Sequence, residues 1–106
     1  MARRESGFKD FVLDQLADLR GLTCRVMFGG YGLSLRKTFF GIIHKDRLYF
    51  KVTPLTAAAY KKKGTKPFRV TPKMTLRTYY EVPVDVLEDS ERLTEWAEIS
   101  IAGVEK

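Results

Sequence analysis

The chain has 106 residues, enough for one domain spanning residues 1–106 and too few for a second. Hydrophobic residues make up 44% of it, including seven Phe, five Tyr and one Trp, which argues against a disordered chain. The single cysteine, Cys24, excludes an internal disulfide and a cysteine-rich zinc site. The sequence contains neither a secretory signal nor about 18 consecutive apolar residues, so we expect a cytoplasmic protein without a membrane span.

The net charge of +6 is distributed unevenly along the chain. Residues 1–35 carry a net charge of +1, residues 36–77 carry +11 and residues 78–106 carry −6. This asymmetry predicts either an anionic partner or basic and acidic surfaces that meet across subunits. The alternative is a solvated surface on which an acidic helix lies beside a basic sheet.

The first half of the chain predicts one helix and four strands. Ser6 is a candidate N-cap, and Gly21 is the expected end of a helix whose apolar residues recur at helical spacing. Strands are expected at 25–28, 31–36, 39–44 and 47–52. Gly29-Gly30 and Lys45-Asp46 are the expected hairpin turns between them.

The second half predicts a short helix over 57–63, with Thr56 as its N-cap and Gly64 at its end. Strands follow at 68–71 and 77–82, and Pro83 opens a C-terminal helical region. Consecutive hairpins imply a mainly antiparallel sheet. We therefore predict a two-layer α+β fold with helices on one face, in the order α-β-β-β-β-α-β-β-α.

The side chains needed for catalysis are sparse. His44 is the only histidine, and pairing it with Cys24 would require two separate strands to converge. The glycines between residues 29 and 32 link two strands, so they offer no helix N-terminus to a phosphate. We therefore expect no enzymatic activity, no catalytic or metal site and no cofactor.

The outer face of the predicted sheet is more informative. If Leu48 and Phe50 face the helices, then Tyr49 points away from them, and the same alternation turns Phe68 inward. Basic and aromatic side chains on a sheet suit single-stranded nucleic acid, and they also suit a homodimer interface, in which Tyr and Arg are enriched. The candidate contact residues on this face and the neighbouring helix are Arg47, Tyr49, Lys51, Lys61, Lys62, Lys63, Lys66, Arg69, Arg77 and Tyr79.

Several short motifs in order resemble one known family. They are Met27-Phe28-Gly29-Gly30-Tyr31-Gly32-Leu33, Phe40-Gly41-Ile42-Ile43, Asp46-Arg47-Leu48-Tyr49-Phe50-Lys51, Pro67-Phe68, Tyr79-Tyr80-Glu81-Val82-Pro83 and Trp96-Ala97. Together they cover nearly the whole chain and resemble the TfoX N-terminal domain family.

That family is similar to the Sxy/TfoX regulators of natural competence, which act as coactivators beside the cyclic-AMP receptor protein. Those proteins continue into a second helical domain, whereas this sequence ends at Lys106, so we expect a single-domain member. The resemblance implies a two-layer α+β fold, no known enzymatic activity, and a regulatory protein, DNA or both as partners. The alternative is a homodimeric interaction domain with no nucleic-acid role.

Overall fold

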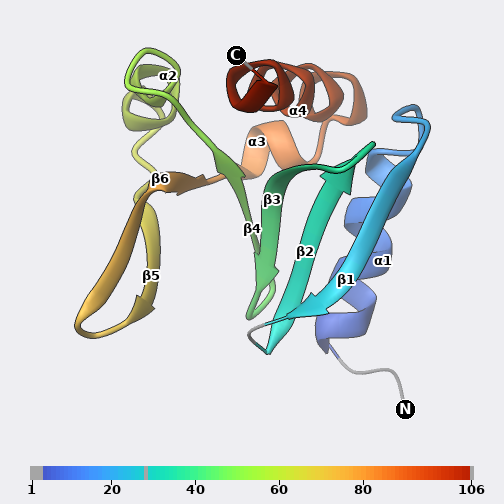
Figure 1. The fold of residues 1–106 in the computed structure, drawn as a ribbon, viewed down its shortest axis with the longest axis horizontal. Coiled ribbons are helices and arrows are strands. Elements are labelled where there is room, and N and C mark those ends of the chain that lie inside the picture. The colour runs from blue at the N-terminus through green and yellow to red at the C-terminus, as the bar shows by residue number, and fades with distance from the viewer. Residues whose placement is uncertain (1–3, 28, 106) are drawn as a thin grey trace.

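The computed structural model describes residues 4–27 and 29–105, and its elements are helices and antiparallel strands (Figure 1). Phe28, predicted to end the first strand, lies outside the described residues. In chain order the elements are α1 (Arg4–Gln15), β1 (Leu22–Met27), β2 (Gly30–Leu35), β3 (Thr38–His44), β4 (Arg47–Lys51), α2 (Ala57–Lys62), β5 (Pro67–Thr71), β6 (Met74–Glu81), α3 (Val84–Leu87) and α4 (Ser90–Glu105).

The strands form one open sheet in the order β1-β2-β3-β4-β6-β5, and each neighbouring pair is antiparallel. The predicted α+β class and the predicted succession of helices and strands are therefore confirmed. The C-terminal helical region consists of two helices, since α3 ends at Leu87 and α4 begins at Ser90. Among the described helices, none combines the length and the apolar composition needed to cross a bilayer.

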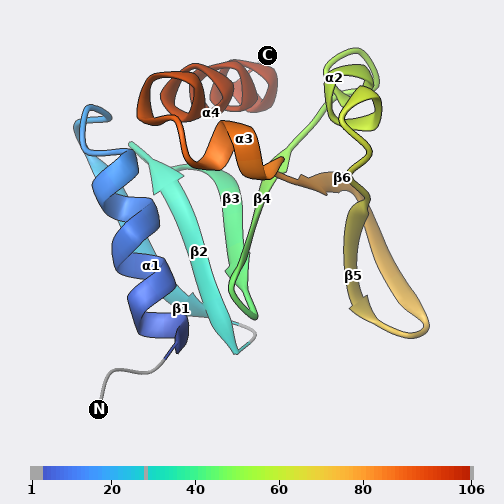
Figure 2. The same ribbon diagram turned by 180° about the vertical axis from the view of Figure 1, so that it is seen from behind.

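One core fills the space between the sheet and the helices. Each of the four helices contributes to it, for example through Val12 of α1, Tyr60 of α2, Val86 of α3 and Leu93 of α4. In Figures 1 and 2, α1 lies along β1 and β2, while α4 lies across one end of β3 and β4. Burial of each large apolar side chain stabilises the fold by about 1.5–3 kcal/mol. The face of the sheet that carries these side chains therefore packs against the helices. The strand residues that complete the core include Leu33, Phe40, Ile43, Leu48 and Phe50.

The predicted hairpin glycines have two different roles. Gly29 has φ of 74°, as expected for a turn residue, whereas Gly30 already belongs to β2 and pairs with Met27. A Cβ atom on Gly30 would overlap the backbone carbonyl oxygen of Ile43. Gly30 is therefore required by the close approach of β3, and its assignment to the turn is wrong.

Two further hairpin turns consist of charged residues. Lys45 and Asp46 connect β3 to β4 as predicted, with φ of 50° and 62°. Arg36 and Lys37 connect β2 to β3, with φ of 47° and 74°. Positive φ at both central residues is the type I′ geometry, which suits two-residue hairpins even where glycine is absent.

The ends of the first helix differ from the prediction. Ser6 lies inside α1, so it is not the N-cap, and α1 ends at Gln15. Gly21, with φ of 90°, ends the turns that lead into β1 and not the helix itself. Leu16 and Leu19 are nevertheless buried, because the turns after α1 keep their side chains against the core.

The ends of α2 are fixed by local hydrogen bonds. Thr56 occupies the N-cap position as predicted, but it adopts a helical conformation and its side chain makes no capping hydrogen bond to α2. Instead the Thr56 N–H donates to Oγ1 of Thr53 (3.1 Å), and the Thr53 N–H donates to Oγ1 of Thr56 (2.8 Å). This reciprocal pattern is that of a capping box. Gly64 ends the helix as predicted, with φ of 81° and a bond from the Thr65 N–H to the Tyr60 carbonyl (3.2 Å).

The last hairpin, β5–β6, turns toward the outer face of the sheet. Pro67 pairs with Tyr80, but the next residue, Phe68, pairs with Leu76, so the register shifts sharply on β6. The shift places Phe68 on the face away from the helices, where it forms a second buried cluster with Tyr49 and Ile42. The prediction that Phe68 faces the helices is therefore wrong, because strand alternation assumes a ladder without bulges.

Candidate anion-binding surface

The outer face of β4 is partly closed. Tyr49 points away from the helices as predicted, yet it is only 8% exposed, because the ring centroid of Phe68 lies 4.5 Å from its own. Burial raises the pKa of the Tyr49 hydroxyl, and the Glu81 carboxylate raises it further. The predicted exposure of Tyr49 is therefore wrong. The buried Tyr49 side chain is therefore not available to a homodimer interface on this face of the sheet.

Three other predicted contact residues of this face are engaged within the protein. Arg47 donates from Nη1 to both carboxylate oxygens of Glu81, at 3.0 and 3.1 Å. The Lys51 ammonium lies 5.8 Å from the centroid of the Tyr79 ring, within the range of a cation–π contact. Tyr79 also packs against Phe39, and burial raises the pKa of its hydroxyl. An external ligand would compete with these contacts.

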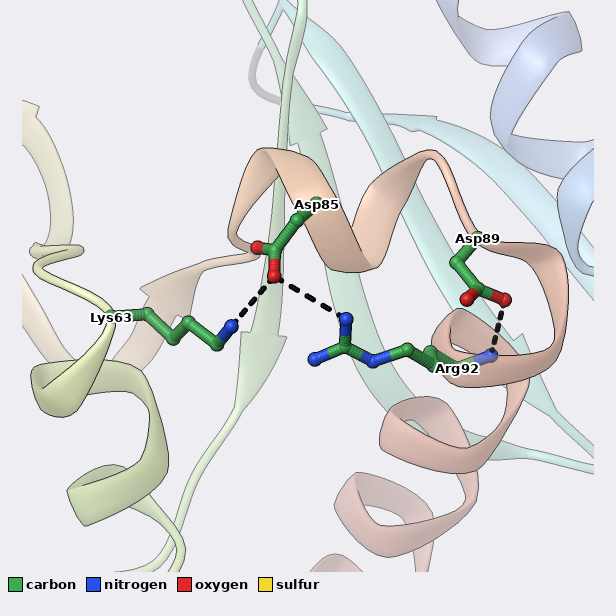
Figure 3. A network of polar contacts seen from close by, with 4 residues as sticks. All are labelled: Lys63, Asp85, Asp89 and Arg92. Atoms are coloured by element: carbon green, nitrogen blue, oxygen red, sulfur yellow. Dashed lines mark hydrogen bonds and ion pairs between the residues drawn. The ribbon is translucent and has the colours of Figure 1, made fainter.

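Lys63 belongs to a polar network that joins α2 to the C-terminal helices (Figure 3). Its ammonium donates to Asp85 Oδ2 at 2.6 Å, and Arg92 Nη1 donates to the same oxygen at 3.3 Å. The hydrogen bond from Lys63 is the main cause that lowers the pKa of Asp85. The Arg92 backbone N–H donates to Asp89 Oδ1 at 3.2 Å, which anchors the start of α4. Lys63 therefore positions α2.

The remaining predicted cations are exposed, and within residues 4–27 and 29–105 no hydrogen bond or ion pair engages their side chains. Lys61 and Arg77 line a hollow of about 320 Å³ between α2 and β6. Lys66, Arg69 and Arg77 line a second hollow, of about 390 Å³, beside the β5–β6 hairpin. Arg77 is common to both hollows, and Lys62 lines neither. We call the surface formed by Lys61, Lys66, Arg69 and Arg77 the basic groove.

The lining of the basic groove suits an anion. Among the residues that the structure describes, no acidic side chain lines either hollow, so an anion bound there would not face a carboxylate in the lining. The sequence did not indicate Thr75 and Thr78, which line the two hollows and bring hydroxyl groups near the cations. Guanidinium groups and hydroxyls are the donors that proteins use for phosphate oxygens. The arrangement can therefore bind a phosphate group.

His44 and Cys24 do not come together. The His44 ring lies edge-on to Phe68, with centroids 5.3 Å apart, on the outer side of the sheet. Cys24 packs against the helix-facing core from β1, and burial raises the pKa of its thiol. The sheet separates the two side chains, so they cannot form a nucleophile–base pair. Over the described ranges, no group of three or more His, Cys, Asp or Glu is placed to hold a metal ion.

A family of known proteins matches most of the chain. Residues 14–104 match the model of the TfoX N-terminal domain. No curated protein matches the chain. The matched region contains the whole sheet, α2, α3 and nearly all of α4, so both hollows of the basic groove lie within it. On this evidence the chain belongs to the TfoX N-terminal domain family.

Proposed function

We propose that this chain is a non-enzymatic regulatory binding domain that contacts DNA phosphates through the basic groove. Membership of the TfoX N-terminal domain family supports a TfoX/Sxy-like regulatory role. The observation that supports DNA as the partner is the groove itself. Its four exposed cations, Lys61, Lys66, Arg69 and Arg77, line two adjoining hollows, and no acid of the described part of the chain lines either of them.

The cations of the groove are better placed for this role than the rest of the predicted set. Arg47 and Lys63 already have carboxylate partners at 3.0 and 2.6 Å, so a phosphate would have to displace these carboxylates. A cation without an internal partner exchanges only solvent and counterions when a phosphate binds. Four such contacts predict that log K falls with log salt with a slope of about −3.6.

The test is fluorescence anisotropy with a labelled mixed-sequence duplex and the matching single strand, titrated across salt concentrations. The double variant Arg69→Gln/Arg77→Gln removes two groove cations. Its matched control, Arg20→Gln/Arg25→Gln, removes two exposed arginines that line neither hollow. Circular dichroism establishes that both variants are folded.

We expect dissociation constants of about 10⁻⁴–10⁻⁶ M for the wild type, typical of contacts made mainly to phosphates. The groove variant should bind at least about tenfold more weakly, with a slope shallower by about 1.8, while the control keeps its slope. Equal weakening of both variants would show that diffuse charge, and not the groove, attracts DNA. Absence of binding even at low salt would overturn the proposal and direct attention to an acidic protein surface as the partner of the groove.

A further inference from the structure

A second surface lies between α2 and α4, away from the basic groove. The two helices run antiparallel, because the end of α2 meets the start of α4 through the Lys63–Asp85–Arg92 network. A hollow of about 190 Å³ separates them, lined by Thr56, Ala59, Tyr60, Trp96 and Ile99. Figure 1 shows the two helices side by side at the same end of the molecule. The lining is almost entirely apolar.

Large apolar side chains are exposed at this surface. Ile99 is 52% exposed on α4, and Leu55, directly before the Thr56 that lines the hollow, is 85% exposed. The exposed Ala59 adds a small apolar side chain on α2. An exposed apolar patch bounded by charges is the usual appearance of a protein interface.

The charges at one end of this patch have opposite signs on the two helices. α2 exposes Lys62, one turn after Ala59, and α4 exposes Glu95 and Glu91, one and two turns before Ile99. Because Lys63 and Arg92 share Asp85, the last turn of α2 is level with the first turns of α4. Because one hollow is lined by both Ala59 and Ile99, the apolar parts of the two helices are level as well.

We propose that a second copy of this chain covers the patch, in a dimer whose two-fold axis runs parallel to α2 and α4. Such an axis places α2 of one protomer over α4 of its partner at the same level. Lys62 then meets the partner's Glu95, and Leu55 meets the partner's Ile99, and the symmetry repeats both contacts. The other in-plane axis would stack α2 on α2 in the reverse direction. Lys62 would then lie opposite the start of the partner's α2, which carries no acidic residue, and the contacts between opposite charges would be lost. The opposite charges on α2 and α4 therefore favour a second copy of the chain as the partner, and they favour this direction of the dimer axis.

The patch is small, so the dimer belongs to the weak class of interfaces and should form in a concentration-dependent way. Sedimentation equilibrium without DNA tests it on the full chain. Ile99→Asp should abolish the concentration-dependent rise in mass. The matched control is Val26→Asp, which replaces an equally apolar, 79% exposed side chain on β1 and should leave self-association unchanged. Circular dichroism of both variants separates a lost interface from a lost fold.

A charge exchange tests the orientation. Lys62→Glu and Glu95→Lys should each weaken self-association at least about tenfold, because each places like charges opposite one another twice in the dimer. An equimolar mixture of the two variants should restore the dimer, since both contacts then pair opposite charges. A wild type that remains monomeric up to millimolar concentration, or a dimer that survives Ile99→Asp, would overturn the proposal. Two monomeric charge variants that do not combine would refute the orientation. None of these outcomes depends on DNA binding by the basic groove.

Discussion

Replacement of Phe68 by Ala tests whether the β5–β6 hairpin is held against the sheet by one buried ring. Phe68 is 1% exposed, and its ring centroid lies 4.5 Å from that of Tyr49 and 5.3 Å from that of His44. Truncation of a buried Phe costs about 3–5 kcal/mol in the free energy of unfolding. The second cluster has only three buried members and a hairpin on one side that can relax. We therefore expect the lower end, about 3 kcal/mol.

Urea unfolding followed by the fluorescence of Trp96 measures this loss, because Trp96 packs against the helix-facing core and reports global unfolding. Met74→Ala is the control, since Met74 lies on the same hairpin but is 53% exposed. Its effect should remain within about 0.5 kcal/mol. A loss below about 1 kcal/mol for Phe68→Ala would refute the packing of this ring and with it the closure of the outer face.

The pKa of Tyr49 shows whether Phe68→Ala changes the packing around Tyr49 itself, which the unfolding experiment does not show. Burial raises the pKa of Tyr49, so the Phe68→Ala variant should return this pKa toward its ordinary value. The ultraviolet absorbance of tyrosinate follows the change in the folded variant. An unchanged titration curve would mean that Tyr49 remains buried by other side chains, contrary to the contact seen here.

Three further predictions concern separate parts of the fold. Gly30→Ala should destabilise the protein by about 1–3 kcal/mol, because the added methyl group overlaps the backbone of β3. Gly7→Ala adds its methyl group in open space on α1 and should stabilise the protein by up to about 1 kcal/mol, as measured by urea unfolding. Equal changes in stability for Gly30→Ala and Gly7→Ala would contradict the argument that β3 packs closely against Gly30. Lys63 lowers the pKa of Asp85, so the stability that Asp85 contributes is present above its unfolded pKa and is lost as pH falls through its folded pKa. The stability difference between the wild type and Asp85→Asn should therefore be constant near neutral pH and vanish in acid, and a pH-independent difference would refute the coupling. Burial raises the pKa of Cys24, so iodoacetamide should alkylate it more slowly than a free thiol at mildly alkaline pH, and an equal rate would show an exposed thiolate.

The fold could largely be predicted from local patterns. The alternation of Leu48, Phe50 and Val52 identified the helix-facing side of β4, and all three are buried in the main core. Gly64 was identified as the end of α2 because a left-handed residue was needed there, and its φ is 81°. These features depend on residues close together in the sequence, for which steric and hydrogen-bonding rules are strong.

The helix starts and the last strand pair could not be predicted in the same way. Thr53 and Thr56 both have hydroxyls suited to capping, and only the path of the chain after β4 decided that they bond to each other. The alternation rule placed Phe68 toward the helices, because nothing in the sequence marks the register shift between β5 and β6.

The basic groove, too, could be predicted from the sequence only in part. The sequence by itself determined the charge: a net of +11 over residues 36–77, with lysines and arginines that had to be exposed because buried cations are costly. It did not determine which of these cations would be engaged by Glu81 and Asp85, since those carboxylates lie far from their partners in sequence.

Only the tertiary structure decided that Lys61 and Arg77 line one hollow while Lys66 and Arg69 line the next. Only the tertiary structure placed the basic end of α2 level with the acidic start of α4. Composition and periodicity specify which side chains avoid water. The distances between charges depend on how β6 bends and where α2 packs, and those are set by contacts between distant parts of the chain.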